Sequence, residues 1–453
     1  MFSRLRSRSW RAGAGEVSEG VSEWVGVCER RGKRETKGMQ LSVRDKETLK
    51  RLAGRYSAIA HREVQKERIE RYYRTNAMEN VRPVVLIDEV PWGEIKDSAL
   101  TNVCAPELGW LESALRCALY QWDHFQVDQV VPPVFQVGKR VRWLRGIGIE
   151  VKEEQIKGDT GAYIASHAYS DQLSTEDDLA KLHPPELVYD QAATEAAMAV
   201  AREVFAGLMD VESVGWNGLH FNIWDDVARY RGVENLLMDL SERPEFMHAT
   251  ARRFMEIGQA QFKQLEEQGL LDPRPVLLHC TAACSRELPA ADSAGPYRAR
   301  DVWGRCAAQI FGSVSPAMHD EFDLAYNQEL FKDCGLLYYG CCEPMDRKID
   351  ILRKRFKNLR KISITPWADA RRAAEAIGRD YVMAAKPNPA FVATPRFDPA
   401  PVEAEIARYC EACREHGTTL EFVIKDISTI ANNPENLTQW AATVNATIDR
   451  YYS

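Results

Sequence analysis

The 453-residue sequence has no apolar stretch that approaches the roughly 18 residues needed to cross a bilayer, so we expect no transmembrane helix. It also has no Gly-x-Gly-x-x-Gly or Gly-x-x-x-x-Gly-Lys-Ser/Thr loop, which argues against the two common nucleotide-binding motifs. A Gly-x-Ser-x-Gly nucleophile elbow and a His-Glu-x-x-His zinc helix are absent as well. Any chemistry must therefore come from less regular motifs.

Acidic residues outnumber basic residues, with 66 Asp and Glu against 59 Lys and Arg, so the net charge is −7. Duplex binding needs a basic face, so nucleic acid is not expected as a main partner. Hydrophobic residues make up 45% of the chain and charged residues 28%, as in an ordinary globular protein. The eleven cysteines lack the regular spacing of a secreted disulfide framework, so we expect reduced thiols in a cytoplasmic protein.

The first 38 residues differ from the rest of the chain. They combine clustered arginines with Gly and Ser and show little apolar periodicity. A targeting peptide has a similar composition, but four glutamates between positions 16 and 29 argue against one. We therefore interpret 1–38 as a disordered extension, or as residues upstream of a functional start at Met39.

Short apolar segments recur from position 82 onward. Each is bounded by turn residues and has the length of a buried strand. Helical stretches at 192–208, 368–377 and 401–416 lie between them, and Gly378 and Gly417 mark the ends of the last two. The eight predicted strands are 82–88, 125–131, 213–223, 275–280, 336–341, 361–365, 380–385 and 420–425.

Strands that alternate with helices predict an α/β protein with a parallel sheet. The count of eight favours a (β/α)8 TIM-type barrel over an open doubly wound sheet. We expect residues 39–453 to form this barrel, with an N-terminal helical extension before the first strand. Residues 132–192 are rich in Gly and charge and contain two adjacent prolines, so they are expected to form a long insertion or lid after the second strand.

Polar residues follow nearly every predicted strand. The carboxyl ends of barrel strands carry the active groups, so these residues are candidates for one common site. The expected catalytic residues are Glu343, Glu321, Asp426 and Lys386, and the expected substrate-binding residues are His220, Asn222, Tyr339, Trp367, Asn388 and Lys425.

Two lysines at neighbouring strand ends suggest the charge of the substrate. Lys386 and Asn388 lie in a rigid turn with two prolines, and Lys425 follows the next strand. Their positive charge favours an anionic substrate such as a carboxylate. The alternative is an ion pair between Lys425 and Asp426.

The segment 338–346, Tyr-Tyr-Gly-Cys-Cys-Glu-Pro-Met-Asp, places two thiols and a carboxylate at a strand end. In an extended strand Cys341 and Cys342 point to opposite faces, whereas Tyr339, Cys341 and Glu343 share one face. Zinc takes three or four S, N and O ligands, which these residue types supply. We expect a zinc site from Cys341, Cys342 and His279. The alternative is that one of the two thiols only fills the core.

These motifs, in this order, resemble the uroporphyrinogen decarboxylase superfamily over about residues 210–450. The superfamily fold is a (β/α)8 barrel, and its members include porphyrin-pathway decarboxylases and cobalamin-dependent methyltransferases. The resemblance rests on the helix start Val-Ser-Pro-Ala-Met-His-Asp-Glu-Phe at 314–322, the strand end Tyr-Gly-Cys-Cys-Glu at 339–343, the turn Lys-Pro-Asn-Pro at 386–389 and the turn Asn-Pro-Glu-Asn-Leu at 433–437.

The methyltransferase branch implies a zinc site built from a His-x-Cys strand end and a later Cys. Cys341 takes the place of the first Cys, but Tyr339 stands in the place of the His and Asn388 in that of the later Cys. The resemblance therefore implies an atypical zinc site, in which Glu343, Glu321 or His279 substitutes as a ligand.

The resemblance implies a corrinoid-dependent methyltransferase of the demethylase type, which moves a methyl group between a small substrate and a separate corrinoid protein. The corrinoid is expected on a partner because the chain has no Asp-x-His-x-x-Gly cobalamin motif. One alternative is a cofactor-free decarboxylase that binds a carboxylate through Arg, Lys386 or Lys425 and protonates through Asp88 or Asp426. Another is a non-enzymatic ligand-binding barrel. A homodimer is a further expectation.

Overall fold

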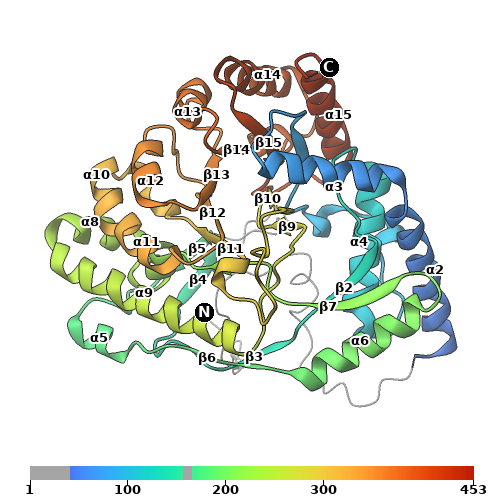
Figure 1. Ribbon diagram of the computed structural model, residues 1–453, viewed down its shortest axis with the longest axis horizontal. Coiled ribbons are helices and arrows are strands. Elements are labelled where there is room, and N and C mark those ends of the chain that lie inside the picture. The colour runs from blue at the N-terminus through green and yellow to red at the C-terminus, as the bar shows by residue number, and fades with distance from the viewer. Residues whose placement is uncertain (1–40, 157–165, 453) are drawn as a thin grey trace, which may run out of the picture.

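The computed structural model describes residues 41–156 and 166–452 (Figure 1). Two N-terminal helices, α2 (Val43–Ala60) and α3 (Glu63–Asn76), precede the first strand of the central sheet. The predicted N-terminal helical extension is therefore confirmed. The extension expected at 1–38 lies outside the described residues.

The centre of the protein is a seven-stranded parallel sheet, so the predicted α/β fold is confirmed. The strand order is β1-β15-β14-β13-β12-β11-β8, and every neighbouring pair is parallel. Most of these strands are buried along their whole length, as in a sheet that is covered on both faces. The strands are β1 (Val84–Ile87), β8 (Leu219–His220), β11 (Trp303–Cys306), β12 (Leu336–Tyr339), β13 (Leu359–Ile364), β14 (Val382–Ala385) and β15 (Thr419–Ile424).

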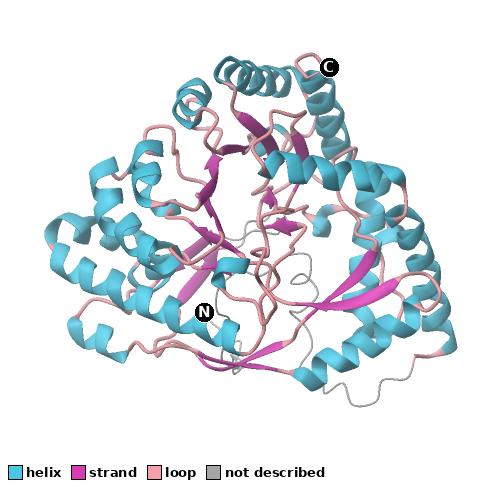
Figure 2. Cartoon of the chain, in the orientation of Figure 1, coloured by secondary structure: helices cyan, strands magenta, loops and turns pink. Residues whose placement is uncertain are grey.

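Helices surround the strands on the outside (Figure 2). Alternate strand residues, such as Leu337, Ile362 and Phe422, belong to the same large apolar core as the inward faces of these helices. No described helix is both long enough and apolar enough to cross a membrane. The helices after α3 are α4 (Gly109–His124), α5 (Glu176–Lys181), α6 (Gln191–Phe205), α7 (Ile223–Arg231), α8 (Val233–Glu242), α9 (Pro244–Glu267), α10 (Pro316–His319), α11 (Ala325–Phe331), α12 (Ile349–Arg355), α13 (Ala370–Ile377), α14 (Pro399–His416) and α15 (Glu435–Asp449).

Backbone hydrogen bonds do not close this sheet into a barrel, since β1 and β8 are its two edges within the described residues. The predicted second strand, 125–131, lies beside β1. The Asp128 N–H donates to the Val85 carbonyl at 2.8 Å, and the Asp128 carboxylate accepts from the Val85 N–H at 2.9 Å. One of the two links is thus made by a side chain, so this segment is not a regular strand. Closure of the barrel stays a prediction.

The predicted strand 275–280 does not join the sheet. It contributes one arm of an antiparallel hairpin formed by β9 (Leu277–Leu278) and β10 (Thr281–Ala282). The place between β8 and β12 is taken by β11, which is not among the predicted strands. β11 contains Gly304 and Arg305 in four residues, so it lacks the apolar run that identifies a buried strand in a sequence.

The β9–β10 hairpin lies at the centre of the protein, with the strands of the sheet around it (Figure 1). Leu278 and Ala282 of the hairpin share one apolar cluster with Val84, Tyr338 and Val423, which come from three different strands. Burial of these side chains stabilises the hairpin at about 25 cal/mol for each Å² of apolar surface removed from water. The hairpin is therefore part of the core and not an external loop.

A buried ion pair holds the hairpin in place. Lys361 of β13 donates to Glu421 of β15 at 2.7 Å, and neither side chain is accessible to solvent. Lys361 also donates to the Thr281 hydroxyl at 2.8 Å and to the Ala282 carbonyl at 2.7 Å. The Thr281 hydroxyl donates to Glu421. Buried charges are tolerated when they are paired and hydrogen-bonded, and this network meets both conditions.

The segment 132–192 has secondary structure of its own in its described part. β2 (Val134–Gly138) pairs with β7 (Asp210–Val214), and β3 (Val141–Arg145) pairs with β6 (Glu186–Tyr189). β4 and β5 form a third pair, made of Glu153–Ile156 and Ser166–Tyr169. The role of this segment as an insertion or lid stays a prediction.

We expect Lys361→Met to destabilise the protein by about 3–5 kcal/mol, because Glu421 is then buried without its partner. The free energy of unfolding from denaturant titration measures this loss. The double variant Lys361→Met/Glu421→Leu should recover most of it, since neither charge remains. As a control, Lys332→Met removes an exposed ion pair with Glu329 and should leave the free energy of unfolding nearly unchanged. A Lys361→Met protein as stable as wild type would contradict the assigned role.

Candidate metal centre

The chain bends sharply where β12 ends, at Gly340, whose φ of +97° favours glycine. The bend brings the Cys341 and Cys342 sulfur atoms to within 3.7 Å of each other. The Lys425 ammonium group donates to both, at 2.9 and 3.1 Å. The prediction that the two thiols point to opposite faces is therefore wrong, because it assumed that the strand continues.

The same bend separates Cys341 from its neighbours in sequence. The Glu343 carboxylate accepts hydrogen bonds from the Cys341 N–H at 2.9 Å and the Ala308 N–H at 3.1 Å, so it holds two loops together. The Tyr339 hydroxyl donates to Asp323 at 2.6 Å, in the helical layer outside the sheet. The expectation that Tyr339, Cys341 and Glu343 share one face is therefore also wrong.

His279 and Cys280 form the turn between β9 and β10, so the hairpin carries both to the carboxyl ends of the sheet strands. Cys280 has a φ of +52°, a left-handed conformation that is uncommon for residues with a side chain. Its N–H donates to Asp88 at 2.7 Å, and its carbonyl accepts from Lys386 at 2.5 Å. Asp88 and Lys386 directly follow β1 and β14, so the sheet itself holds this turn.

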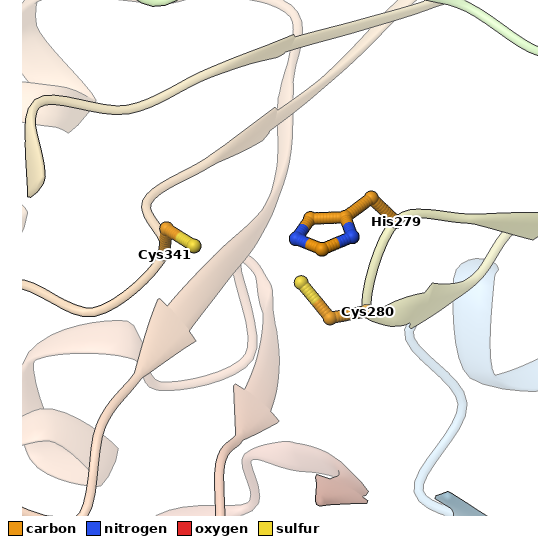
Figure 3. A group of neighbouring side chains, drawn as sticks. All are labelled: His279, Cys280 and Cys341. Atoms are coloured by element: carbon orange, nitrogen blue, oxygen red, sulfur yellow. The ribbon is translucent and has the colours of Figure 1, made fainter. Parts of the chain in front are cut away.

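His279, Cys280 and Cys341 form one group, whose ligand atoms all lie within 4.8 Å of one another (Figure 3). Both cysteines are buried and His279 is partly buried. One imidazole nitrogen and two thiol sulfurs are donors that zinc prefers, and three protein ligands leave a fourth position for a substrate or water. The group can therefore bind a metal ion such as zinc. It contains the predicted ligands His279 and Cys341 but not Cys342.

The charges around the group favour the thiolate form of Cys280. Burial acts to raise the pKa of Cys280, but a hydrogen bond from Cys341 and the positive charges of His279, Lys425 and Lys386 lower it well below its usual value. The same hydrogen bond raises the pKa of Cys341. Because metals bind the thiolate, Cys280 is prepared to act as a ligand, and Cys341 loses its proton when the metal binds.

Two carboxyl groups lie close to the His279 ring. Asp88 Oδ2 is 4.0 Å from Nδ1, and Glu89 Oε1 is 3.6 Å from Nε2. A carboxylate beside a metal-binding imidazole orients the ring, so Asp88 can support His279 as a ligand. Burial raises the pKa of Glu89 to about 8, against the charge of His279, so its carboxyl group carries a proton at neutral pH.

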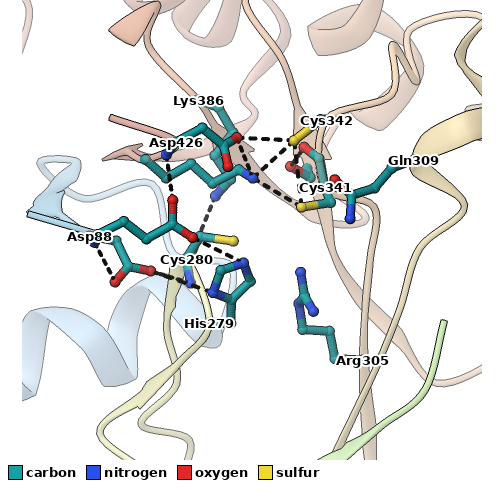
Figure 4. A network of polar contacts seen from close by, with 12 residues as sticks. Asp88, His279, Cys280, Arg305, Gln309, Cys341, Cys342, Lys386 and Asp426 are labelled. Atoms are coloured by element: carbon teal, nitrogen blue, oxygen red, sulfur yellow. Dashed lines mark hydrogen bonds and ion pairs between the residues drawn. The ribbon is translucent and has the colours of Figure 1, made fainter. Parts of the chain in front are cut away.

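Lys425 and Asp426 both contact the thiols, and Figure 4 shows Asp426 beside Cys342. Lys425 Nζ lies 2.7 Å from Asp426, so the two form the ion pair considered as an alternative above. The Asp426 carboxylate accepts a hydrogen bond from the Cys342 thiol at 3.0 Å, and the Asp426 backbone N–H donates to the Glu89 carboxyl group at 2.5 Å. Burial acts to raise the pKa of Asp426, but Lys425 outweighs it and lowers the pKa. Asp426 is therefore ionised at neutral pH.

Arg305 faces the metal group from β11 (Figure 4). Its Nη1 atom contacts the imidazole of His220. Asn222, two residues further along, accepts a hydrogen bond from the Ala307 N–H at 2.9 Å and so supports the loop after β11. Of these two predicted substrate-binding residues, His220 is connected to the site through Arg305. The contact of Asn222 is with the backbone of the loop after β11.

Three further predicted site residues have contacts elsewhere. Glu321 lies 3.1 Å from His248 on the helical layer. Trp367 is 70% exposed. Asn388 accepts a hydrogen bond from the Ala390 N–H at 3.0 Å and caps a short turn. None of these contacts involves His279, Cys280 or Cys341, so a role of Glu321, Trp367 and Asn388 in the site stays a prediction.

Cys280 and Arg305 belong to the site but are not among the predicted site residues. Cys280 follows the predicted ligand His279, and a strand at 275–280 would have pointed the two side chains apart. In a two-residue turn they can face the same side. The His-Cys pair was therefore the available signal for Cys280, whereas Arg305 lies in a segment without a recognisable strand pattern.

No family model matches this chain, and no curated protein is similar to it in sequence. Among solved structures, a methyltransferase from Methanosarcina mazei is similar with a TM-score of 0.46 and 14% sequence identity. The similarity covers 84% of this chain and 98% of that chain.

We expect the purified protein to bind one zinc ion after dialysis against zinc, measured by elemental analysis. His279→Ala, Cys280→Ser and Cys341→Ser should each lower the affinity at least tenfold, because each removes one of three ligands. Cys342→Ser should retain the metal, and Cys284→Ser, a buried thiol outside the group, serves as the matched control. Equal zinc binding by wild type and Cys341→Ser would rule out this ligand set.

Proposed function

We propose that this protein is a corrinoid-dependent methyltransferase of the demethylase type, which transfers a methyl group between a small substrate and a separate corrinoid protein. The observation that supports this most is the group of His279, Cys280 and Cys341 at the strand ends. The family resemblance implies one His and two Cys as ligands, and this chain has Tyr339 and Asn388 at two of the three places. The hairpin turn brings the missing donor types, an imidazole and a second thiol, to the same thiol of Cys341.

The residues around this group have separate tasks in the proposed reaction. His279, Cys280 and Cys341 would hold a zinc ion, which would supply a Lewis acid toward the heteroatom that carries the methyl group. Asp88 fixes the turn by accepting from the Cys280 N–H. As the methyl group leaves, the heteroatom keeps the bonding electron pair and takes up a proton. Burial raises the pKa of Glu89 and so favours its protonated form, and Glu89 is the proposed donor of that proton.

The proposal includes a corrinoid on a partner protein that approaches the carboxyl ends of the sheet strands. We also propose that 125–131 completes the wall between β1 and β8 of a (β/α)8 barrel. Residues 132–192, which follow this segment directly, are then placed to act as the lid. Both ideas follow from the chain order and from the contact between Asp128 and Val85.

We expect zinc-loaded protein to methylate free cob(I)alamin when supplied with a methoxy, methylthio or N-methyl compound. The absorption spectrum of the corrinoid measures the transfer. Cys280→Ser and Cys341→Ser should lower the rate at least a hundredfold, because the Lewis acid is lost, and Cys284→Ser should not change it. Equal rates with and without zinc for every donor that reacts would contradict the proposed role of the metal.

Decarboxylation is the second candidate, favoured by two buried cations at the site, Arg305 and Lys386. A cofactor-free decarboxylase needs positive charge for the carboxylate but no zinc. We expect Cys341→Ser, which lacks the metal, to release no CO₂ from carboxylated donors that wild type demethylates. CO₂ release that is equal in wild type and Cys341→Ser would favour decarboxylation over methyl transfer.

A further inference from the structure

Arg305 is a buried cation at the edge of the metal group. It is 3% exposed and pairs in register with His220 of β8 and Tyr338 of β12. Trp303, two residues earlier on the same strand, donates from its indole to the Ala283 carbonyl that follows the hairpin. Alternate strand residues share a face, so Arg305 lies on the hairpin side of the sheet.

Half of the Arg305 guanidinium group has no partner among the described residues. Nη1 contacts His220, and the guanidinium carbon lies 5.9 Å from the centre of the Tyr338 ring. Nε is buried without a hydrogen bond, and no carboxylate of the described chain forms an ion pair with this arginine. The unused edge of Nε and Nη2 is the one that binds a carboxylate with two parallel hydrogen bonds.

Lys386 adds a second buried positive charge close to the same tyrosine. It is 2% exposed, and its Nζ lies 5.6 Å from the Tyr338 ring centre and donates to the Cys280 carbonyl. It forms no ion pair within 41–156 and 166–452. In contrast, the buried cations Arg116 and Lys361 each have a carboxylate partner.

Burial removes the hydration of Arg305 and acts to lower its pKa, but the charge of the Cys280 thiolate outweighs burial and raises the pKa. No carboxylate of the described residues forms an ion pair with the guanidinium group, and its Nε has no hydrogen bond. Arg305 points toward His279 and Cys341 (Figure 4). An anion bound to the free guanidinium edge would therefore lie next to the metal group and supply the hydrogen-bond partner that the described residues do not.

We propose that the substrate carries a carboxylate group, which binds the Nε and Nη2 edge of Arg305 while its reacting end faces the metal group. Lys386, which also lies near the Tyr338 ring, adds to the positive potential. This names the substrate class for the proposed methyl transfer and rests on that function for the reaction, although the binding of the carboxylate can be measured without it.

The test uses three anions, benzoate, 4-methoxybenzoate and benzenesulfonate. Benzamide, which has nearly the shape of benzoate but no charge, is the neutral comparison. Calorimetric titration of the zinc-loaded protein should show that the carboxylates bind at least tenfold more tightly than benzamide. In Arg305→Gln this preference should be lost, with carboxylate affinity lowered about thirtyfold and benzamide affinity nearly unchanged. Arg305→Lys should keep part of the preference, since it keeps the charge but loses the fork. Arg371→Gln, an exposed arginine distant in sequence, is the control.

Melting temperatures distinguish a variant that has lost the binding site from a variant that does not fold. Without ligand, Arg305→Met should melt at about the same temperature as wild type or higher, because it removes a buried guanidinium group whose Nε has no hydrogen bond and leaves no carboxylate without an ion-pair partner. Benzoate should raise the melting temperature of wild type but not of Arg305→Met. A strong loss of stability in ligand-free Arg305→Met would instead assign this arginine a structural role and overturn the proposal.

The remaining outcomes separate this inference from the proposed function. Equal affinity of wild type for carboxylates and benzamide overturns the carboxylate site, even if cob(I)alamin is methylated. Tighter binding of benzenesulfonate than of benzoate overturns the assignment of a carboxylate in favour of a sulfonate. Conversely, carboxylate binding that depends on Arg305, together with no methyl transfer, supports the site and counts only against the proposed reaction.

Discussion

The site depends on the buried ion pair between Lys361 and Glu421, because this pair holds the β9–β10 hairpin inside the sheet. A charged pair at zero exposure is rarely stabilising by itself, since two ions lose their hydration. Here the Thr281 hydroxyl and the Ala282 carbonyl accept further hydrogen bonds from the Lys361 ammonium group. The polar network thus fixes the position of a hairpin that its apolar contacts alone would hold less specifically.

The position of the hairpin decides the chemistry of its turn. His279 and Cys280 reach Cys341 only because the hairpin brings them to the carboxyl ends of the strands, where Asp88 and Lys386 hold the Cys280 backbone. The positive φ of Cys280 is maintained by these contacts from two strands. Lysines and a histidine around buried sulfur atoms lower the pKa of one thiol and prepare it for metal binding.

The sequence was sufficient for the parts of the fold that depend on local patterns. The apolar runs of β1, β12, β13, β14 and β15 identified these strands, and Gly378 and Gly417 marked the ends of α13 and α14. β11 was missed because Gly304 and Arg305 interrupt its apolar pattern. The segment 275–280 was assigned to the sheet because an apolar run shows that a strand is buried but not what covers it.

For the site, local sequence patterns were enough to identify the residue types and two of the three metal-group members, His279 and Cys341. That Cys280 joins them, and that Tyr339 and Glu343 do not, became visible in the folded chain. The reason is geometric: a single positive φ at Gly340 or Cys280 reverses which face a side chain occupies, and local patterns do not reveal it. The role proposed for Arg305 likewise rests on a missing contact, because its buried Nε has no hydrogen-bond partner among the described residues. Such an absence is visible only once the chain is folded.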